Sequence, residues 1–136
     1  MTDFQGKIAL VTGASSGIGA ETARLLSEGG ARVFGAQRGL SDFEDIAVDF
    51  ADPSSPERAI EHIAKATGQL DILVNNAGVM REGTVEETSL DDWHLQMQIN
   101  LTVPFLLIRY AMPLLRAARG AIVNVGSIEG LGNNPR

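Results

Sequence analysis

A glycine-rich segment near the N-terminus, Thr12–Gly19, constrains the fold of this chain more than any other feature. It reads Thr-Gly-Ala-Ser-Ser-Gly-Ile-Gly and follows a short apolar run, Ile8–Val11. It leads into a helical pattern whose apolar face is expected to contain Ile18, Thr22, Leu25 and Leu26. The order of buried strand, glycine turn and helix N-terminus suits a phosphate, because free N–H groups and the helix dipole both attract an anion.

Each glycine of this turn has a physical role. Gly13 lets the chain leave the strand sharply, Gly17 lets the backbone approach a pyrophosphate, and Gly19 lets the helix pack close to the strand. The spacing Gly-x-x-x-Gly-x-Gly differs from the commoner Gly-x-Gly-x-x-Gly, so alone it also fits a tight structural connection. A P-loop is excluded, because Ile18 and Gly19 stand where its lysine and its magnesium-binding hydroxyl belong.

Composition narrows the class of protein. The 136 residues are 44% hydrophobic and 21% charged, as in a single soluble domain spanning residues 1–136. The net charge of −6 argues against a nucleic-acid partner or an anionic membrane surface. No unbroken apolar stretch approaches the length of a membrane span, and the first strand begins too early to leave room for a signal peptide.

Metal and disulfide chemistry find no support in the composition. There is no cysteine, which excludes disulfides and thiolate metal sites, and no metal-ligand spacing of other residues stands out. No metal site is expected, and the cytoplasm is taken as the default location.

Strands and helices are expected to alternate along the chain. Further strands are expected at Arg32–Ala36, Ile46–Val48, Leu70–Val74 and Ala121–Val125. The segment Gly39–Asp45 is too short for a crossover helix and is expected to be a plain loop. The last residues, Ile128–Arg136, also look like loop.

Two more helices follow from their start signals. The first begins in Asp52–Glu57 with a serine cap and a proline in its first turn, and stops at Gly68. The residues it is expected to bury are Ala59, Ile60, Ile63 and Ala64. The second is capped by Ser89 and runs to about Arg116, with kinks expected at Pro104 and Pro113.

This alternation predicts an α/β fold with a doubly wound parallel sheet of Rossmann type, in strand order 3-2-1-4-5. In such sheets ligands bind beyond the carboxyl ends of the strands. The unusual residues all fall at those ends, namely Thr12–Gly19, Gln37, Arg38, Asp49, Asn75–Gly78 and Ser127. The pattern therefore predicts one binding crevice.

The motifs together resemble the short-chain dehydrogenase/reductase family. The matching segments are Thr12–Gly19, Asp52-Pro53, Asp71–Gly78, Ile99–Leu101 and Ile122–Ser127. They occur in the family's order and span most of the chain. The resemblance implies a nicotinamide dinucleotide cofactor, a small-molecule alcohol or carbonyl substrate, and a homotetramer or homodimer built partly on the long helix.

The resemblance also implies roles for single residues. Ser127 would hydrogen-bond the substrate oxygen, and Asn100, at a break in the long helix, would hold a water in a proton relay. Asp49 and the backbone of Phe50 would meet the adenine. The glycine turn would hold the pyrophosphate and adenosine ribose, and the segment after the fourth strand would line the cofactor. The residues concerned are Gly13, Ser15, Ser16, Gly17, Ile18, Gly19, Asn76, Ala77 and Gly78.

Charge at the end of the second strand bears on cofactor choice. An acid there would bond the ribose 2′-hydroxyl of NAD, whereas this chain has Gln37 followed by Arg38. A guanidinium suits the 2′-phosphate of NADP through charge-assisted bonds, so NADP is favoured over NAD. Ser16 weakens this argument, because NADP-dependent relatives often carry a basic residue in the turn.

The sequence departs from the family in lacking the Tyr-x-x-x-Lys acid–base motif. The only tyrosine, Tyr110, has Leu114 where the lysine belongs. We therefore expect a portion of a longer enzyme that interconverts an alcohol and a ketone or aldehyde, with the chain alone inactive. The alternative is a shortened, non-catalytic dinucleotide-binding or regulatory module.

Overall fold

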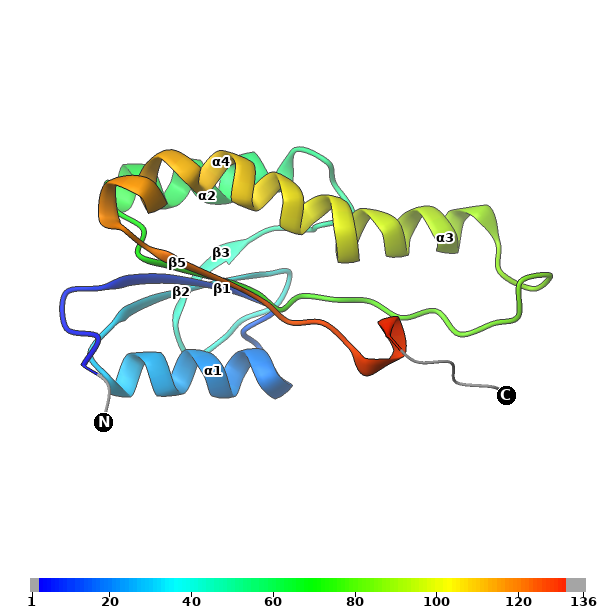
Figure 1. Cartoon of the computed structure of the whole chain (residues 1–136), viewed down its shortest axis with the longest axis horizontal. Coiled ribbons are helices and arrows are strands. Elements are labelled where there is room, and N and C mark those ends of the chain that lie inside the picture. Colours follow the sequence, from blue (N-terminus) through cyan, green and yellow to red (C-terminus); the bar gives the residue numbers. More distant parts are fainter. Residues whose placement is uncertain (1–2, 132–136) are drawn as a thin grey trace.

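The computed structural model describes residues 3–131 as a three-layer α/β/α domain (Figure 1). The strands are β1 (Ile8–Thr12), β2 (Arg32–Gln37), β3 (Glu44–Ala47), β4 (Ile72–Asn75) and β5 (Ala121–Asn124). They form one parallel sheet in the order β3-β2-β1-β4-β5, which confirms the predicted topology. All five strands therefore end at the same edge of the sheet, on the right of Figure 1.

Helices cover both faces of this sheet. The helix α1 (Gly17–Glu28) covers one face, and α2 (Ser55–Ala66) and α4 (Val103–Ala118) cover the other (Figure 1). The side chains of β1 alternate between the two layers, as a strand buried on both faces requires. Leu10 belongs to the core beneath α2 and α4, whereas Ala9 and Val11 belong to the core beneath α1.

The long helix is divided by a wider turn. It begins as α3 (Leu90–Met97), passes through a π-helical segment η1 (Gln98–Thr102) and continues as α4. Ser89 caps it as predicted, because its hydroxyl accepts the N–H of Asp92 at 3.1 Å.

By length and composition alone, Leu90–Ala118 is the one helix in residues 3–131 that could cross a membrane, with a mean hydropathy of 1.3. Its inner face packs into the core of the domain through Val103, Leu107, Ala111 and Leu115.

Several local predictions were wrong. Ile18 and Leu25 are 66% and 54% exposed, because α1 instead turns its small residues Gly19 and Ala23, with Leu26, toward the sheet. Ala64 is exposed on α2. Ser54 precedes α2 without a capping bond from its side chain, since its hydroxyl donates to Asp52 instead.

Other element boundaries differ from the predicted ones by a few residues. The loop before β3 is confirmed as helix-free, but β3 starts at Glu44 and ends at Ala47. The final segment contains a short 3₁₀ turn, η2 (Ile128–Gly130), and residues 132–136 of the predicted loop lie outside the described residues. The strand β5 lies at one edge of the sheet, and all four of its residues are exposed.

Asp71 ties the amino ends of β1 and β4 together. Its carboxylate accepts the N–H of Ile8 at 2.9 Å, the amide of Gln69 at 2.5 Å and the ammonium of Lys7 at 3.3 Å. Burial alone would raise the pKa of Asp71, but these three donors outweigh it and hold the pKa below its ordinary value.

Acid should weaken the fold through Asp71. Because the folded pKa lies below the unfolded one, the stabilisation is present above about pH 4 and is lost as the pH falls through the folded pKa. We expect Asp71→Asn to lower the free energy of unfolding by about 1–2 kcal/mol at neutral pH and to lose part of the acid dependence. Urea unfolding at several pH values measures both effects, and a variant with the same acid slope as the parent would contradict the assignment.

Candidate cofactor site

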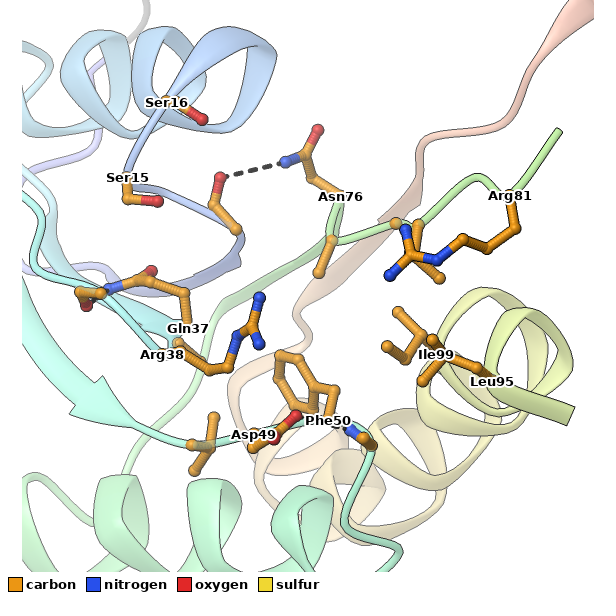
Figure 2. A pocket seen from close by; sticks show the side chains of 18 residues that line it. Ser15, Ser16, Gln37, Arg38, Asp49, Phe50, Asn76, Arg81, Leu95 and Ile99 are labelled. Carbon is orange, nitrogen blue, oxygen red and sulfur yellow. Dashed lines mark hydrogen bonds between the residues drawn. The ribbon is translucent and has the colours of Figure 1, made fainter. Parts of the chain in front are cut away.

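A cleft of about 860 Å³ opens at the carboxyl ends of the strands. Its walls come from the turn after β1, the end of β2, the segment after β3, the loop after β4, and helical residues of α3 and η1 (Figure 2). Ten of the predicted cofactor residues line it: Gly13, Ser15, Ser16, Gln37, Arg38, Asp49, Phe50, Asn76, Ala77 and Gly78. The volume is in the range of small-molecule sites, so the fold gathers the predicted residues around one cavity.

The N-terminus of α1 forms one wall and is open to an anion. The first backbone bond of the helix runs from the N–H of Ala20 to the carbonyl of Ser16 at 3.2 Å, so the N–H groups before it have no helical acceptor. Ser16 makes no capping bond, and the first turn carries no acid, unlike the first turns of α2 and α3. Nothing in the helix itself therefore competes with a bound phosphate for this end of the dipole.

Gly17, Ile18 and Gly19 are not among the lining residues. Gly17 has a positive φ of 57°, which lets the chain enter the helix from the turn. Gly19 instead packs behind the turn, where an added Cβ would stand 2.1 Å from the carbonyl oxygen of Gly13. The role predicted for Gly19, close packing of helix on strand, matches this contact.

The loop after β4 is fastened to the glycine turn by hydrogen bonds. Thr12 as a residue is only 2% exposed. Its hydroxyl accepts hydrogen bonds from the backbone N–H groups of Asn76 and Ala77 at 3.0 and 2.9 Å. The amide of Asn76 donates to the carbonyls of Thr12 and Gly13 at 3.1 and 3.3 Å, and Figure 2 shows the second bond. These bonds fix the two walls of the cleft relative to each other.

Gln37 and Arg38 have different environments at the end of β2. The side chain of Gln37 is buried, and its amide bonds the protein itself. Arg38 is exposed, and its side chain extends into the cleft above Asp49 (Figure 2). No hydrogen bond or ion pair joins the guanidinium of Arg38 to any of residues 3–131. Arg38, rather than Gln37, is the group with free donors at this end.

Asp49 and Phe50 close the cleft below Arg38. One oxygen of Asp49 accepts the N–H of Ala51 at 2.9 Å, which leaves the carboxylate partly available to a ligand. Phe50 is buried, and its carbonyl accepts the amide of Gln98 at 3.4 Å. This contact ties the segment after β3 to the π-helical turn.

Asn100 and Ser127 lie outside the cleft lining. The amide of Asn100 bonds both backbone groups of Val79, donating at 2.7 Å and accepting at 2.8 Å, so it braces the loop after β4. One N–H and one lone pair of this amide remain for a water. Ser127 follows β5 at the same edge of the sheet, is exposed, and accepts the N–H of Glu129 at 3.2 Å.

Part of the wall was not assigned to the cofactor from the sequence, although the segment Val79–Val85 was expected to contact the substrate. Arg81 enters the cleft from the loop after β4 (Figure 2). Its Nε lies 3.7 Å from a carboxylate oxygen of Asp92. Its position only three residues after Gly78, which was predicted to line the cofactor, could have indicated that Arg81 also lies at the cleft. Among residues 3–131, no group of three or more metal-ligating side chains is gathered in one place. The other lining residues that were not predicted to bind the cofactor are Ala36, Gly39, Val48, Ala51, Val79, Leu95 and Ile99.

Comparison with known proteins places this geometry in a family. An uncharacterized oxidoreductase of Thermotoga maritima is 39% identical, covering 98% of this chain and 59% of the relative. A 3-alpha-(or 20-beta)-hydroxysteroid dehydrogenase of Mycobacterium tuberculosis is 38% identical, covering 93% of this chain and 53% of the relative. The chain thus spans between 53% and 59% of the length of these two curated relatives.

Comparison with solved structures also finds a similar fold. The Pseudomonas aeruginosa RhlG/NADP active-site complex superposes with a TM-score of 0.89 at 33% identity, covering 98% of this chain and 59% of that one. The family model described as short chain dehydrogenase matches residues 7–136. This chain belongs to the short-chain dehydrogenase family of oxidoreductases.

Proposed function

We propose that the protein carrying this chain is a nicotinamide-dinucleotide-dependent oxidoreductase that interconverts an alcohol and a ketone or aldehyde. The observation that carries the proposal is the single cleft in which the α1 N-terminus, Arg38 and the loop after β4 converge. An anion-binding helix end and an unpaired guanidinium match the phosphates of a dinucleotide. The NADP complex of the P. aeruginosa structural neighbour supports the same cofactor class.

Each wall of the cleft has a task in this proposal. The turn Gly13–Gly19 holds the pyrophosphate and adenosine ribose, and Asp49 with the backbone of Phe50 meets the adenine. Arg38 meets a 2′-phosphate, which favours NADP over NAD. Asn76, Ala77 and Gly78 line the cofactor. When bound, the reduced nicotinamide ring supplies the hydride.

The reacting end uses Ser127, which follows β5, and Asn100 of η1. Ser127 donates a hydrogen bond to the substrate oxygen, which stabilises the negative charge that develops when the carbonyl is reduced. Asn100 keeps the loop after β4 in place and offers its remaining N–H and lone pair to a water in the proton relay. The resemblance implies an acid–base tyrosine and a lysine, and we assign both to the part of the protein that lies outside this chain.

We also propose a homo-oligomer that uses the long helix. Four large apolar side chains, all at least 38% exposed, repeat every four residues along α3, η1 and α4: Trp93, Met97, Leu101 and Phe105. Such a stripe favours a second copy of the chain over solvent. Light scattering on the full-length protein tests this proposal, and a monomeric mass would contradict it. A cytoplasmic location remains part of the proposal and is tested by cell fractionation.

Substitution of Ser127 tests the catalytic part. With reduced coenzyme and a panel of aliphatic and cyclic ketones and aldehydes, we expect Ser127→Ala to lower kcat about 100-fold, because one donor to the developing oxyanion is lost. Ser127→Thr keeps the hydroxyl and should retain most activity. The measurement is the loss of reduced-nicotinamide absorbance by the full-length protein.

The outcomes of this experiment separate the proposed oxidoreductase from the non-catalytic alternative. Equal turnover by the parent and Ser127→Ala would remove Ser127 from the reaction. Coenzyme binding without turnover of any carbonyl compound would favour the alternative, a non-catalytic dinucleotide-binding module.

A further inference from the structure

The side chain of Gln37 has no donor left for a cofactor. It is 8% exposed, and its oxygen accepts the N–H of Ala14 at 3.1 Å. Its two N–H groups donate to the carbonyl of Gly39 at 3.2 Å and to Asp45 at 2.8 Å. An amide has two donors, and both are used, so Gln37 cannot donate to a phosphate.

Asp45 completes this network from β3. Its carboxylate accepts the backbone N–H of Ser41 at 3.0 and 3.1 Å and the hydroxyl of Ser41 at 2.5 Å. The Ser41 hydroxyl bond, with the Ser41 N–H and the Gln37 amide, outweighs desolvation and holds the pKa of Asp45 below its ordinary value. Asp45 is therefore ionised at neutral pH, but its charge is satisfied by Ser41 and Gln37 and does not capture Arg38.

The network joins two walls of the cleft across Gly35. Ala14 belongs to the glycine turn, whereas Gly39 and Ser41 belong to the loop between β2 and β3. A Cβ at Gly35 would stand 3.0 Å from the hydroxyl of Ser41 and 3.1 Å from the Gln37 oxygen. The absence of a side chain at Gly35 leaves room for the loop to fold back over the strand.

Arg38 depends on this loop for its orientation. Its guanidinium makes no bond to the described part of the chain, so within that part the side chain is anchored only where it leaves the backbone between Gln37 and Gly39. Gln37 bonds Gly39 directly and is itself held by Asp45. The backbone on both sides of Arg38 is thus fixed before any ligand binds, which lowers the ordering cost of binding.

We propose that Asp45, acting through Gln37 and Ser41, is a positioning residue for cofactor choice, because it holds Arg38 where the guanidinium meets the 2′-phosphate of NADP. The inference rests on the proposed function, since it needs a nicotinamide dinucleotide in the cleft. Asp45 does not line the cleft, so its effect on the cofactor passes through Arg38.

A double-mutant cycle on the full-length protein tests this inference. The Kd values for NADPH and NADH are measured by fluorescence titration for the parent, Asp45→Ala, Arg38→Ala and the double variant. We expect Asp45→Ala to raise the Kd for NADPH about tenfold and the Kd for NADH less than about twofold. In the Arg38→Ala background, Asp45→Ala should change neither Kd further. Asp45→Asn, which keeps an acceptor for Gln37, should recover most of the NADPH affinity.

Other outcomes overturn the proposal. Equal weakening of both coenzymes, additive effects of Asp45→Ala and Arg38→Ala, or no change would each show that Asp45 does not act through Arg38. If Asp45→Ala fails to fold, Ser41→Ala removes the hydroxyl that donates to Asp45 and accepts the N–H of Phe43, while it keeps the bond from the Ser41 N–H to Asp45. This variant should show the same selective loss. If the parent binds neither coenzyme, the proposed function itself fails.

Discussion

Gly19→Ala should abolish coenzyme binding and lower the free energy of unfolding by about 3 kcal/mol or more, although alanine is the better helix former. Helix propensity alone would stabilise the variant by about 1 kcal/mol. The added Cβ would however stand 2.1 Å from the carbonyl oxygen of Gly13 and 2.4 Å from the amide nitrogen of Asn76. Both groups are held by hydrogen bonds, so α1 must move away from the turn.

Gly17→Ala is the matched control in the same turn. Gly17 has a positive φ but no atom within 4 Å of an added Cβ, so this variant meets only backbone strain of about 1–2 kcal/mol. Urea unfolding and a coenzyme titration of both full-length variants make the comparison. A Gly19→Ala protein as stable as Gly17→Ala would mean that the close contact between helix and turn does not exist.

Thr12→Val should also destabilise the protein strongly, by about 2–4 kcal/mol. Valine has nearly the same shape as threonine but accepts no hydrogen bond. The substitution would leave the N–H groups of Asn76 and Ala77 without their acceptor inside the structure. Because Ala77 lines the cleft, coenzyme affinity should fall together with stability.

Thr12→Ser isolates the hydroxyl from the methyl group. Serine keeps the acceptor and loses one buried methyl, which costs about 1 kcal/mol. We therefore expect Thr12→Ser to be the more stable variant by denaturant unfolding. The reverse order would show that packing, rather than the hydrogen bonds of Thr12, holds the loop after β4.

The fold could be predicted because two repeating signals agree. Apolar runs such as Ile8–Val11 end at polar residues and alternate with helical patterns, which leaves few arrangements besides a parallel sheet. The shared carboxyl edge of that sheet then places Gly13, Asp49 and Asn76 around one cleft, as the structure has them. The alternation of strands and helices was enough to predict that the carboxyl ends of the strands lie at one edge of the sheet.

Side-chain environments were harder to predict. Apolarity suggested that Ile18 and Leu25 face the core, but α1 instead turns Gly19 and Ala23, with Leu26, toward the sheet. Gln37 lies at the predicted ligand position, yet its amide is used by Ala14 and Asp45. Ala14 lies in the glycine turn and Asp45 in β3, and the sequence around Gln37 gives no sign of either contact.

The most direct test of this account is a calorimetric titration of the full-length protein with NADPH and NADH. We predict one coenzyme bound per chain, tighter binding of NADPH than of NADH, and loss of that difference in Arg38→Ala. Failure of both coenzymes to bind would contradict the claim that the strand ends form a nicotinamide dinucleotide site.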